Sequence, residues 1–344
     1  MSLTGRFSSE LLRVDPEKEA ARICGRVREL MLSQVKRRGL VIGLSGGIDS
    51  SVTAALAVRA LGRERVLGLE MPERHSADES VRLSGMLAAS LGIATVREDI
   101  SGILDAVGFY RRYDEAAQLV VPGYGAGWKS KIVTTDVMQH SGFTAFYLVA
   151  QAPDASIVRT RLPLKPYLEI VAATNFKQRI RKMLEYYHAD RLHFGVAGTP
   201  NRLEYDQGFF VKLGDGAADI KPIAHLYKSQ VYQLAEYLGI PEEIRKRKPT
   251  TDTYSLAQGQ DEFYFSLPYD KMDLCLFGKN GGVPADRVAS ALGLEPEQVE
   301  MVFKDIDTKR ETTRYLHLPP LLVDDIGWHD ANGQKDTKNG GTPT

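Results

Sequence analysis

The segment LVIGLSGGIDSS, residues 40–51, places a carboxylate and three hydroxyl groups on a glycine turn that follows a short apolar run. The run is typical of a buried strand, and the residues after the glycines are typical of a helix start, where backbone N–H groups favour a phosphate. A Walker A loop would supply a lysine after its last glycine, but Asp49 stands there. Because a carboxylate beside phosphates requires a divalent cation between them, the turn predicts a cradle for the ATP pyrophosphate with Mg²⁺ on Asp49.

The pattern of this turn is more specific than a pair of glycines. Two glycines beside an aspartate or a serine would be explained as a capped turn, but six matched positions at a strand-to-helix junction favour a nucleotide site. The pattern resembles the signature of the N-type ATP pyrophosphatases, the PP-loop superfamily. That resemblance implies cleavage of ATP between its α and β phosphates and adenylation of a carboxylate or carbonyl. The residues expected to contact ATP here are Gly43, Leu44, Ser45, Gly46, Gly47, Ile48, Asp49, Ser50, Ser51 and Met71.

A second run of motifs lies within residues 175–252 and reads NFKQRIR, then GVAGTPNRLEYDQGFFVKLGDGAADIKPIAHLYKSQV, then IPEEIRKRKPTTD. Together with the glycine turn, this run resembles the ammonia-dependent NAD synthetases over about 35–105 and 170–275. The resemblance implies that ATP, held with Mg²⁺, adenylates the nicotinate carboxylate of deamido-NAD. Ammonia would then displace AMP to give NAD, with pyrophosphate as the other product.

The same resemblance implies roles for single residues. The predicted catalytic residues are Asp49, Lys228 and Ser45, and the predicted Mg²⁺ ligands are Asp49 and Glu204. Further contacts with ATP are predicted for Thr199, Lys228 and Thr250. Contacts with deamido-NAD are predicted for Arg179, Lys212 and Asp219. Two carboxylates that hold Mg²⁺ and a lysine suit adenylation, because charge develops on the leaving pyrophosphate. Taken singly, Glu204 and Lys228 could be solvated helix residues, although a lysine in a first helical turn opposes the helix dipole and favours a bound anion. Lys177, Arg181 and the basic run at 245–248 are interpreted as solvated.

Three departures from the family pattern bear on the acceptor. Roughly 60 residues, 108–168, precede the NFKQRIR motif, which is long for a connection unless it forms a subdomain. The family's motif PTADL reads PTTDT in this chain. Many members have a pair of basic residues just before two prolines, where this chain has RYLHL. The basic candidates near that place are Lys309, Arg310, Arg314 and His317. Two alternatives therefore stay open: a paralogue that adenylates and amidates a different carboxylate, and a nucleotide-binding regulator without turnover.

The elements that must position these residues alternate along the first hundred residues. An amphipathic helix is predicted at 16–38, followed by strand, helix, strand, helix and strand, which favours a doubly wound sheet with right-handed crossovers. We expect an α/β fold with a mostly parallel five-stranded sheet flanked by helices, similar to the adenine nucleotide alpha hydrolases. The excursion at 108–168 is expected to contain two short strands. We expect one domain over 1–328, with 108–168 as an insertion and 283–328 as a helical C-terminal extension, and a disordered tail at 329–344.

Composition limits the other function classes. The chain has 344 residues, and its 44 basic and 44 acidic residues create no global field that would recruit nucleic acid or a membrane. Two distant cysteines and no apolar run near 20 residues indicate a cytoplasmic protein with reduced thiols. The family resemblance implies a homodimer. Because the chain has no room for an N-terminal glutaminase domain, free ammonia or a separate glutaminase is the expected nitrogen source.

Overall fold

A four-stranded parallel sheet in the order β3-β2-β1-β7 lies at the centre of the computed structural model, which describes residues 7–76, 78–134, 145–247, 253–256, 259, 264, 265 and 267–324. Its strands are β1 (Leu40–Gly43), β2 (Val66–Glu70), β3 (Ala94–Arg97) and β7 (Gly195–Val196). The register pairs Leu40 with Val66 and with Gly195, so the carboxyl ends of these strands meet at one edge. The parallel sheet is confirmed. The count of five strands is not: beyond β7 the described residues add only the single bridge Ala197–Ile220.

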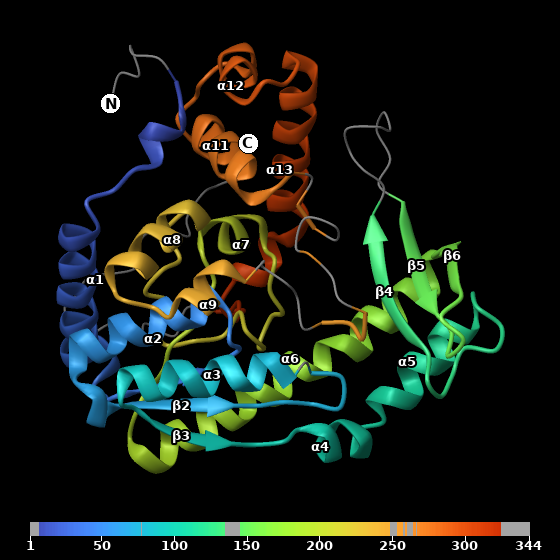
Figure 1. Ribbon diagram of the computed structural model, residues 1–344, viewed down its shortest axis with the longest axis horizontal. Helices are drawn as coiled ribbons and strands as arrows, with labels where there is room; N and C mark the ends of the chain where they lie inside the picture. The colour runs from blue at the N-terminus through green and yellow to red at the C-terminus, as the bar shows by residue number, and fades with distance from the viewer. Residues whose placement is uncertain are drawn as a thin grey trace.

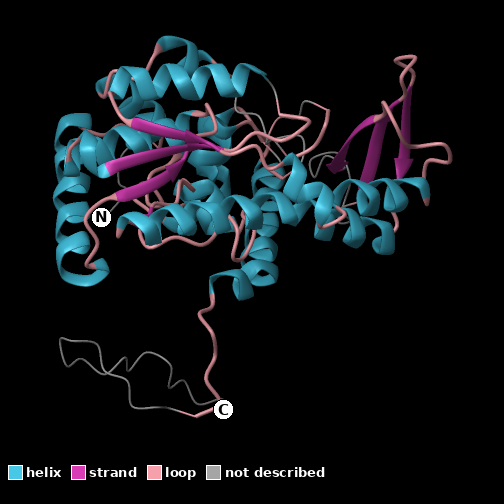
Figure 2. Cartoon of the chain, turned by 90° about the horizontal axis from the view of Figure 1, so that it is seen from below, coloured by secondary structure: helices cyan, strands magenta, loops and turns pink. Residues whose placement is uncertain are grey.

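Helices cover both faces of this sheet (Figures 1 and 2). On one face, Leu40 and Ile42 pack with α1 (Pro16–Leu30), α2 (Ile48–Leu61), α3 (Asp78–Leu91) and α8 (Lys228–Tyr237). On the other, Val41 and Leu69 pack with α4 (Ser101–Ala106), α5 (Phe109–Gln118) and α6 (Leu164–Leu192). Because both faces are covered, β1 and β2 are apolar throughout, as the sequence indicated. The predicted helix at 16–38 continues from α1 into a π-helical turn at Met31–Val35.

The excursion at 108–168 forms a second, antiparallel sheet in the order β4-β5-β6, which stands apart from the parallel sheet (Figure 1). Its strands are β4 (Lys129–Thr134), β5 (Phe146–Gln151) and β6 (Ile157–Arg161). The two predicted strands correspond to β5 and β6, whereas β4 was not predicted as a strand. The Ser130 backbone of β4 is linked to a distant segment: its N–H donates to Ser255 Oγ at 2.9 Å, and its carbonyl accepts from Leu256 N at 3.1 Å.

Short helices and a C-terminal helical layer complete the described chain. They are η1 (Ser9–Leu12), η3 (Arg63–Arg65), α7 (Arg202–Gln207), α9 (Glu242–Lys246), α11 (Tyr269–Asn280), α12 (Ala285–Leu292) and α13 (Pro296–His317). A separate apolar core, which includes Leu203, Leu276 and Val299, joins α7 to α11, α12 and α13. The predicted tail at 329–344 lies outside the described residues.

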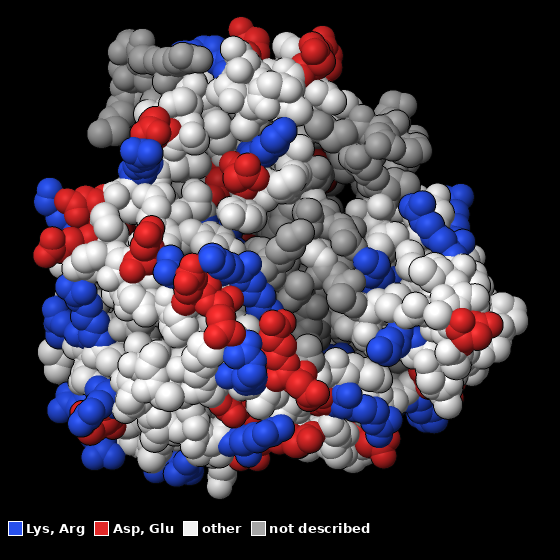
Figure 3. Space-filling model, viewed as in Figure 1, with Lys and Arg blue, Asp and Glu red and all other residues white. Residues whose placement is uncertain are grey.

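No single sign of charge dominates the face of the molecule that Figure 3 shows. Lys and Arg side chains alternate with Asp and Glu on the face shown in Figure 3, in keeping with the balance of 44 and 44. Within the described residues, no helix has both the length and the apolar run that crossing a bilayer requires. Cys24 and Cys275 are both free and buried.

Candidate active site

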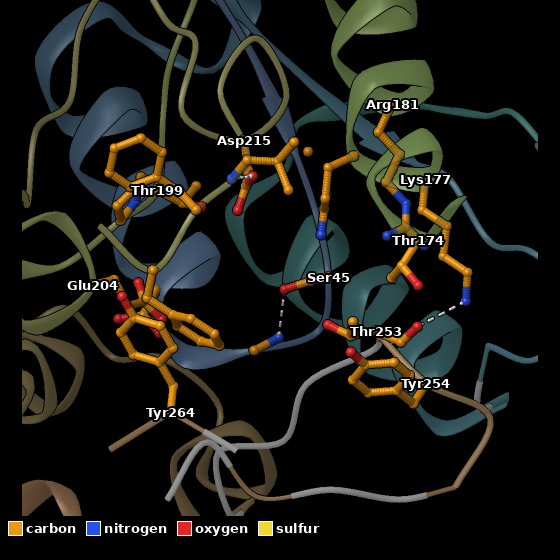
Figure 4. Close-up of a pocket in the computed structure, with 18 of the residues that line it drawn as sticks. Ser45, Thr174, Lys177, Arg181, Thr199, Glu204, Asp215, Thr253, Tyr254 and Tyr264 are labelled. Atoms are coloured by element: carbon orange, nitrogen blue, oxygen red, sulfur yellow. Dashed lines mark hydrogen bonds between the residues drawn. The ribbon is translucent and has the colours of Figure 1, made fainter. Parts of the chain in front are cut away.

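A cavity of about 2010 Å³ opens where the carboxyl ends of β1, β2 and β7 meet. Ligands of open α/β sheets bind at this edge. The glycine turn after β1 forms its floor, and the cavity is also lined by the end of β2, one side of α6, the loop after β7, the first residue of α8 and the last turns of α13. The fold therefore brings the two motif runs of the sequence into one space, as Figure 4 shows for Ser45, Thr199, Glu204, Lys177 and Thr253.

The glycine turn has its shape because larger residues do not fit. Gly46 has a φ of +70°, and a Cβ there would lie 2.6 Å from Ser80 O. Gly47 precedes α2 and offers no side-chain cap, so the first N–H groups of that helix remain available to an anion. Ser45 Oγ and Ser50 Oγ are hydrogen-bonded at 3.1 Å, which aligns both hydroxyls with the turn. The turn therefore has a shape that could hold a phosphate, and its role as an ATP cradle stays a prediction.

Asp49, Glu204 and Lys228 lie together above this turn, although they are far apart in the sequence. Lys228 Nζ pairs with Asp49 Oδ2, and the lysine is only 2% exposed. Burial alone would lower the pKa of this ammonium, but the Asp49 and Glu204 carboxylates outweigh burial and raise the pKa above its ordinary value. The Lys228 charge is therefore fixed at neutral pH, and the interpretation of Lys228 as a solvated helix residue is wrong.

Asn201 links the two carboxylates and was not assigned a role from the sequence. Its Nδ2 donates to Asp49 Oδ1 at 3.1 Å, and its backbone N–H donates to Glu204 Oε2 at 3.2 Å. Its own Oδ1 accepts from Glu204 N, which completes a capping box at the start of α7. The motif GTPNRLE contains this signal, because an asparagine three residues before a glutamate is a helix-start pattern. Asn201 therefore keeps Asp49 and Glu204 side by side.

Most of the predicted site residues line the cavity. They are Gly43, Leu44, Ser45, Gly47, Ile48, Asp49, Ser50, Met71, Arg179, Thr199, Glu204, Lys212 and Lys228. Gly46 and Ser51 stand behind the turn, where Ser51 Oγ donates to Gly47 O at 2.8 Å. Thr250 lies outside the described residues. All predicted ATP contacts with a described position except Gly46 and Ser51 thus line the same cavity.

Of the three predicted contacts with deamido-NAD, Arg179 and Lys212 line the cavity and Asp219 does not. Arg179 lies on α6 with an exposed side chain, and its Nε donates to Lys212 O at 3.3 Å. Lys212 lines the cavity, but its ammonium donates to Tyr315 O at 2.6 Å and to Leu318 O at 3.2 Å, at the end of α13. Asp219 is not among the cavity-lining residues of the described chain; its Oδ2 accepts from Val196 N at 2.7 Å and secures the end of β7. The roles of these three residues stay predictions.

Lys177 was interpreted as a solvated residue, and this interpretation is wrong. Lys177 is 2% exposed, and its Nζ donates to Glu73 Oε1 at 2.8 Å and to Thr253 O at 3.1 Å (Figure 4). Tyr110 OH donates to the other Glu73 oxygen at 3.0 Å. Burial opposes the ionised form of Glu73, but Lys177 and His75 prevail and lower the pKa of this carboxyl. The pair therefore connects the end of β2 to α6 and to the segment at 253–256.

Arg181 and Arg247 were also interpreted as solvated residues, but both donate hydrogen bonds to other parts of the protein. Arg181 Nε donates to Met71 O at 3.2 Å, next to the glycine turn. Arg247, from the basic run at 245–248, donates to Gly46 O at 3.4 Å and to Ser80 Oγ at 3.0 Å. These arginines hold the cavity wall and the turn in place, which no local pattern in the sequence indicated.

Two further acidic residues, the buried Glu185 and the half-buried Asp215, form a second cluster that lines the cavity. Glu185 Oε2 accepts from Lys182 Nζ at 2.5 Å, both on α6, and burial raises the pKa of Glu185 despite this lysine. Burial also raises the pKa of Asp215, whose Oδ1 accepts from Val211 N at 2.8 Å. Gly43 is required here because a Cβ at that position would lie 2.9 Å from Glu185 Oε1. The sequence analysis missed this cluster.

Comparison with known proteins agrees with the geometry. The family model described as NAD synthase matches residues 20–150 and 152–315. The NH(3)-dependent NAD(+) synthetase of Mesorhizobium japonicum is 57% identical over 317 residues, covering 92% of this chain and 99% of that protein. The protein of the same name from Rhizobium meliloti is 58% identical over 320 residues, covering 93% and 96%. A solved NH3-dependent NAD synthetase from Campylobacter jejuni, in complex with the nitrate ion, matches with a TM-score of 0.58 at 25% identity, covering 91% of this chain and 100% of that one. The chain belongs to the NAD synthase family.

Proposed function

We propose that this protein catalyses the ATP-dependent amidation of deamido-NAD by ammonia, with NAD, AMP and pyrophosphate as products. The observation that carries the proposal is the meeting of Asp49, Glu204 and the Lys228 ammonium above a helix N-terminus in one large cavity. The relatives with 57% and 58% identity carry the name of this activity, and they are matched over nearly their whole length.

The first half of the reaction transfers AMP to the acceptor. The acceptor carboxylate attacks the α-phosphorus of ATP, and the bond to the bridging oxygen of the pyrophosphate breaks. Negative charge grows on the leaving pyrophosphate, where the N–H groups of α2 and the fixed positive charge of Lys228 stabilise it. The Ser45 hydroxyl lies at the same turn and is held by Ser50, whose own Oγ donates to Gly47 O at 3.1 Å. These groups would act mainly on the departing phosphates.

Asp49 and Glu204 have the chemistry of a Mg²⁺ site. Both offer hard carboxylate oxygens, and Asn201 holds them next to each other. The described residues contain no group of three or more metal-ligating side chains, but Mg²⁺ is commonly held by one or two carboxylates together with substrate phosphates. When bound there, Mg²⁺ would neutralise phosphate charge and align the pyrophosphate for departure.

The second half of the reaction forms the amide. Ammonia attacks the adenylated carbonyl carbon, a C–N bond forms, the bond to AMP breaks, and the nitrogen loses a proton. Arg179 and Lys212, which also line the cavity, carry the charges that suit the phosphates of the dinucleotide acceptor. Asp219 and Thr250 remain predicted contacts of deamido-NAD and of ATP. Ammonia, which the names of the relatives contain, is the proposed nitrogen source, and a separate glutaminase is proposed to supply it.

We further propose that the protein works as a homodimer in the cytoplasm. Leu164, Leu168, Met183 and Tyr187 on α6 are 71%, 53%, 56% and 60% exposed, which is the kind of apolar surface that a subunit contact would cover. Sedimentation equilibrium of the purified protein would measure the mass of the assembly.

The proposed activity is tested by incubating purified protein with ATP, Mg²⁺, ammonium and deamido-NAD. We expect NAD, AMP and pyrophosphate in equal amounts, and no NAD when ammonium is omitted. Pyrophosphate release with another carboxylic acid, and none with deamido-NAD, would replace this proposal by the alternative of a different acceptor. Nucleotide binding without any pyrophosphate release would favour a regulator.

A further inference from the structure

The helix that carries Lys228 caps its own start only in part. The residue before α8 is Tyr227, which lies outside the Ser, Thr, Asp and Asn group that commonly caps helices and makes no side-chain cap hydrogen bond. Gln230 Oε1 accepts from Tyr227 N at 3.0 Å, but this bond leaves the next two N–H groups without a local acceptor. Their partners come from another helix.

Asp273, on α11, supplies both acceptors. Its Oδ1 accepts from Lys228 N at 3.1 Å, and its Oδ2 accepts from Ser229 N at 2.6 Å. Asp273 is 0% exposed. A carboxylate in such a place is costly unless it is hydrogen-bonded, and here the positive end of α8 satisfies it. The contact joins the C-terminal helical layer to the first turn of α8.

That first turn is the base from which Lys228 reaches the phosphate end of the cavity. The lysine ammonium opposes the dipole of its own helix, and its pairing with Asp49 requires the backbone of α8 to begin at one particular place. Asp273 fixes that place by binding the Lys228 backbone directly. It neither lines the cavity nor contacts Asp49 or Glu204 among the hydrogen bonds of the described residues.

We propose that Asp273 is a positioning residue for ATP: its carboxylate holds the first turn of α8 so that the Lys228 ammonium faces the phosphates. The proposal rests on the proposed ATP chemistry of this cavity. The proposal predicts an effect on nucleotide binding that a purely structural cap would not have. A structural cap stabilises the fold whatever side chain stands at 228, whereas a positioning residue affects nucleotide binding only while the lysine is present.

The test compares Asp273→Asn with Asp270→Asn in the full-length protein. Asp270 lies in the first turn of the same helix but is exposed, so its replacement removes the same charge without touching α8. Binding of Mg²⁺ with α,β-methylene-ATP is measured by calorimetry, and kcat and KM are measured for both substrates. We expect Asp273→Asn to weaken binding of the analogue and to lower kcat/KM for ATP by about tenfold, which is about 1.4 kcal/mol. The KM for deamido-NAD should stay within about twofold, and Asp270→Asn should behave as wild type.

The deciding measurement repeats the binding experiment in a Lys228→Ala background. The Asp273→Asn change should then have no further effect beyond about twofold, because no ammonium remains to be positioned. An equal loss of affinity in both backgrounds would overturn the proposal. If Asp273→Asn does not fold by circular dichroism, Asp273→Ser, which keeps one acceptor, takes its place; failure of both to fold would assign Asp273 to stability alone and also overturn the proposal. Because the binding experiment contains no acceptor, it stays readable even if wild type makes no NAD.

Discussion

Replacing Asp49 by asparagine should damage both the activity and the stability of the protein, for separable reasons. The Lys228 side chain is 2% exposed and the Asp49 side chain 17%, so the change leaves a buried ammonium without its direct partner. Breaking a buried ion pair in this way costs about 3–5 kcal/mol. The entropy of unfolding is about 2.1 cal/mol/K per residue. For the 344 residues of this chain, the total entropy of unfolding is therefore roughly 0.7 kcal/mol/K. The melting temperature should therefore fall by about 4–7 °C.

A second change separates the two effects. Lys228→Met in the Asp49→Asn background replaces the buried charge by an apolar chain of similar length, so most of the lost melting temperature should return. Activity should not return, because the variant lacks both the proposed metal carboxylate and the proposed phosphate-binding charge. Circular dichroism melts and pyrophosphate release provide the two measurements. A double variant that melts no higher than Asp49→Asn would refute the ion-pair reasoning, and one with near-normal pyrophosphate release would refute the roles of both residues.

Three further predictions follow from other parts of the site. Arg179→Ala should raise the KM for deamido-NAD about tenfold and leave the KM for ATP within about twofold; equal effects on both would undo the assignment of Arg179 to the acceptor. Lys177→Met should lower the free energy of unfolding in urea by about 3–5 kcal/mol, and Lys177→Met with Glu73→Gln should recover most of it, since the side chains of this pair are 3% and 0% exposed. Burial, opposed by the Ser229 and Lys228 N–H groups, raises the pKa of Asp273 to about 6 from 3.8. Between these values the folded state holds the extra proton, so wild type loses up to about 3 kcal/mol of stability as pH rises from 4 to 7. Asp273→Asn has no carboxyl to ionise here, so its melting temperature should rise relative to that of wild type as the pH increases from 4 to 7. A difference in melting temperature that does not change with pH would contradict the cost of ionising this buried carboxyl.

Features encoded locally were predictable from the sequence. The glycine turn depends on neighbouring residues, because Gly46 needs a positive φ and Gly47 precedes the helix directly. The alternation of strands and helices likewise follows from short-range patterns, which is why the parallel sheet was predicted. The count of five strands was not confirmed: among the described residues, β7 is followed by a single bridge between Ala197 and Ile220 and not by a further strand of the parallel sheet. A short apolar run does not indicate whether it will find a partner.

Features that depend on distant partners were missed. Nothing near Lys177 in the sequence indicates burial, because its partner carboxylate, Glu73, follows β2 and lies 104 residues away. The same holds for the capping of α8 by Asp273, which lies in a helix that looks unremarkable in the sequence. β4 escaped prediction because the burial of Ser130 depends on the hydroxyls of Tyr113 and Tyr124, at 2.8 and 2.7 Å. Pattern reasoning describes single elements, and these contacts exist only between elements.

The capping of α8 by Asp273 also has a consequence for how the protein is made. A ribosome delivers the glycine turn early, but the acceptors for Lys228 N and Ser229 N arrive only with α11, 45 and 44 residues later than the groups they bind. Until then the first turn of α8 must find its hydrogen bonds in water. A nascent chain that ends before α11 contains all four strands of the parallel sheet, but it lacks the Asp273 carboxylate that holds the first turn of α8 at the phosphate end of the cavity. The site should thus reach its full affinity for the nucleotide only late in translation, and a chain on a ribosome stalled before α11 should bind ATP more weakly than the finished protein.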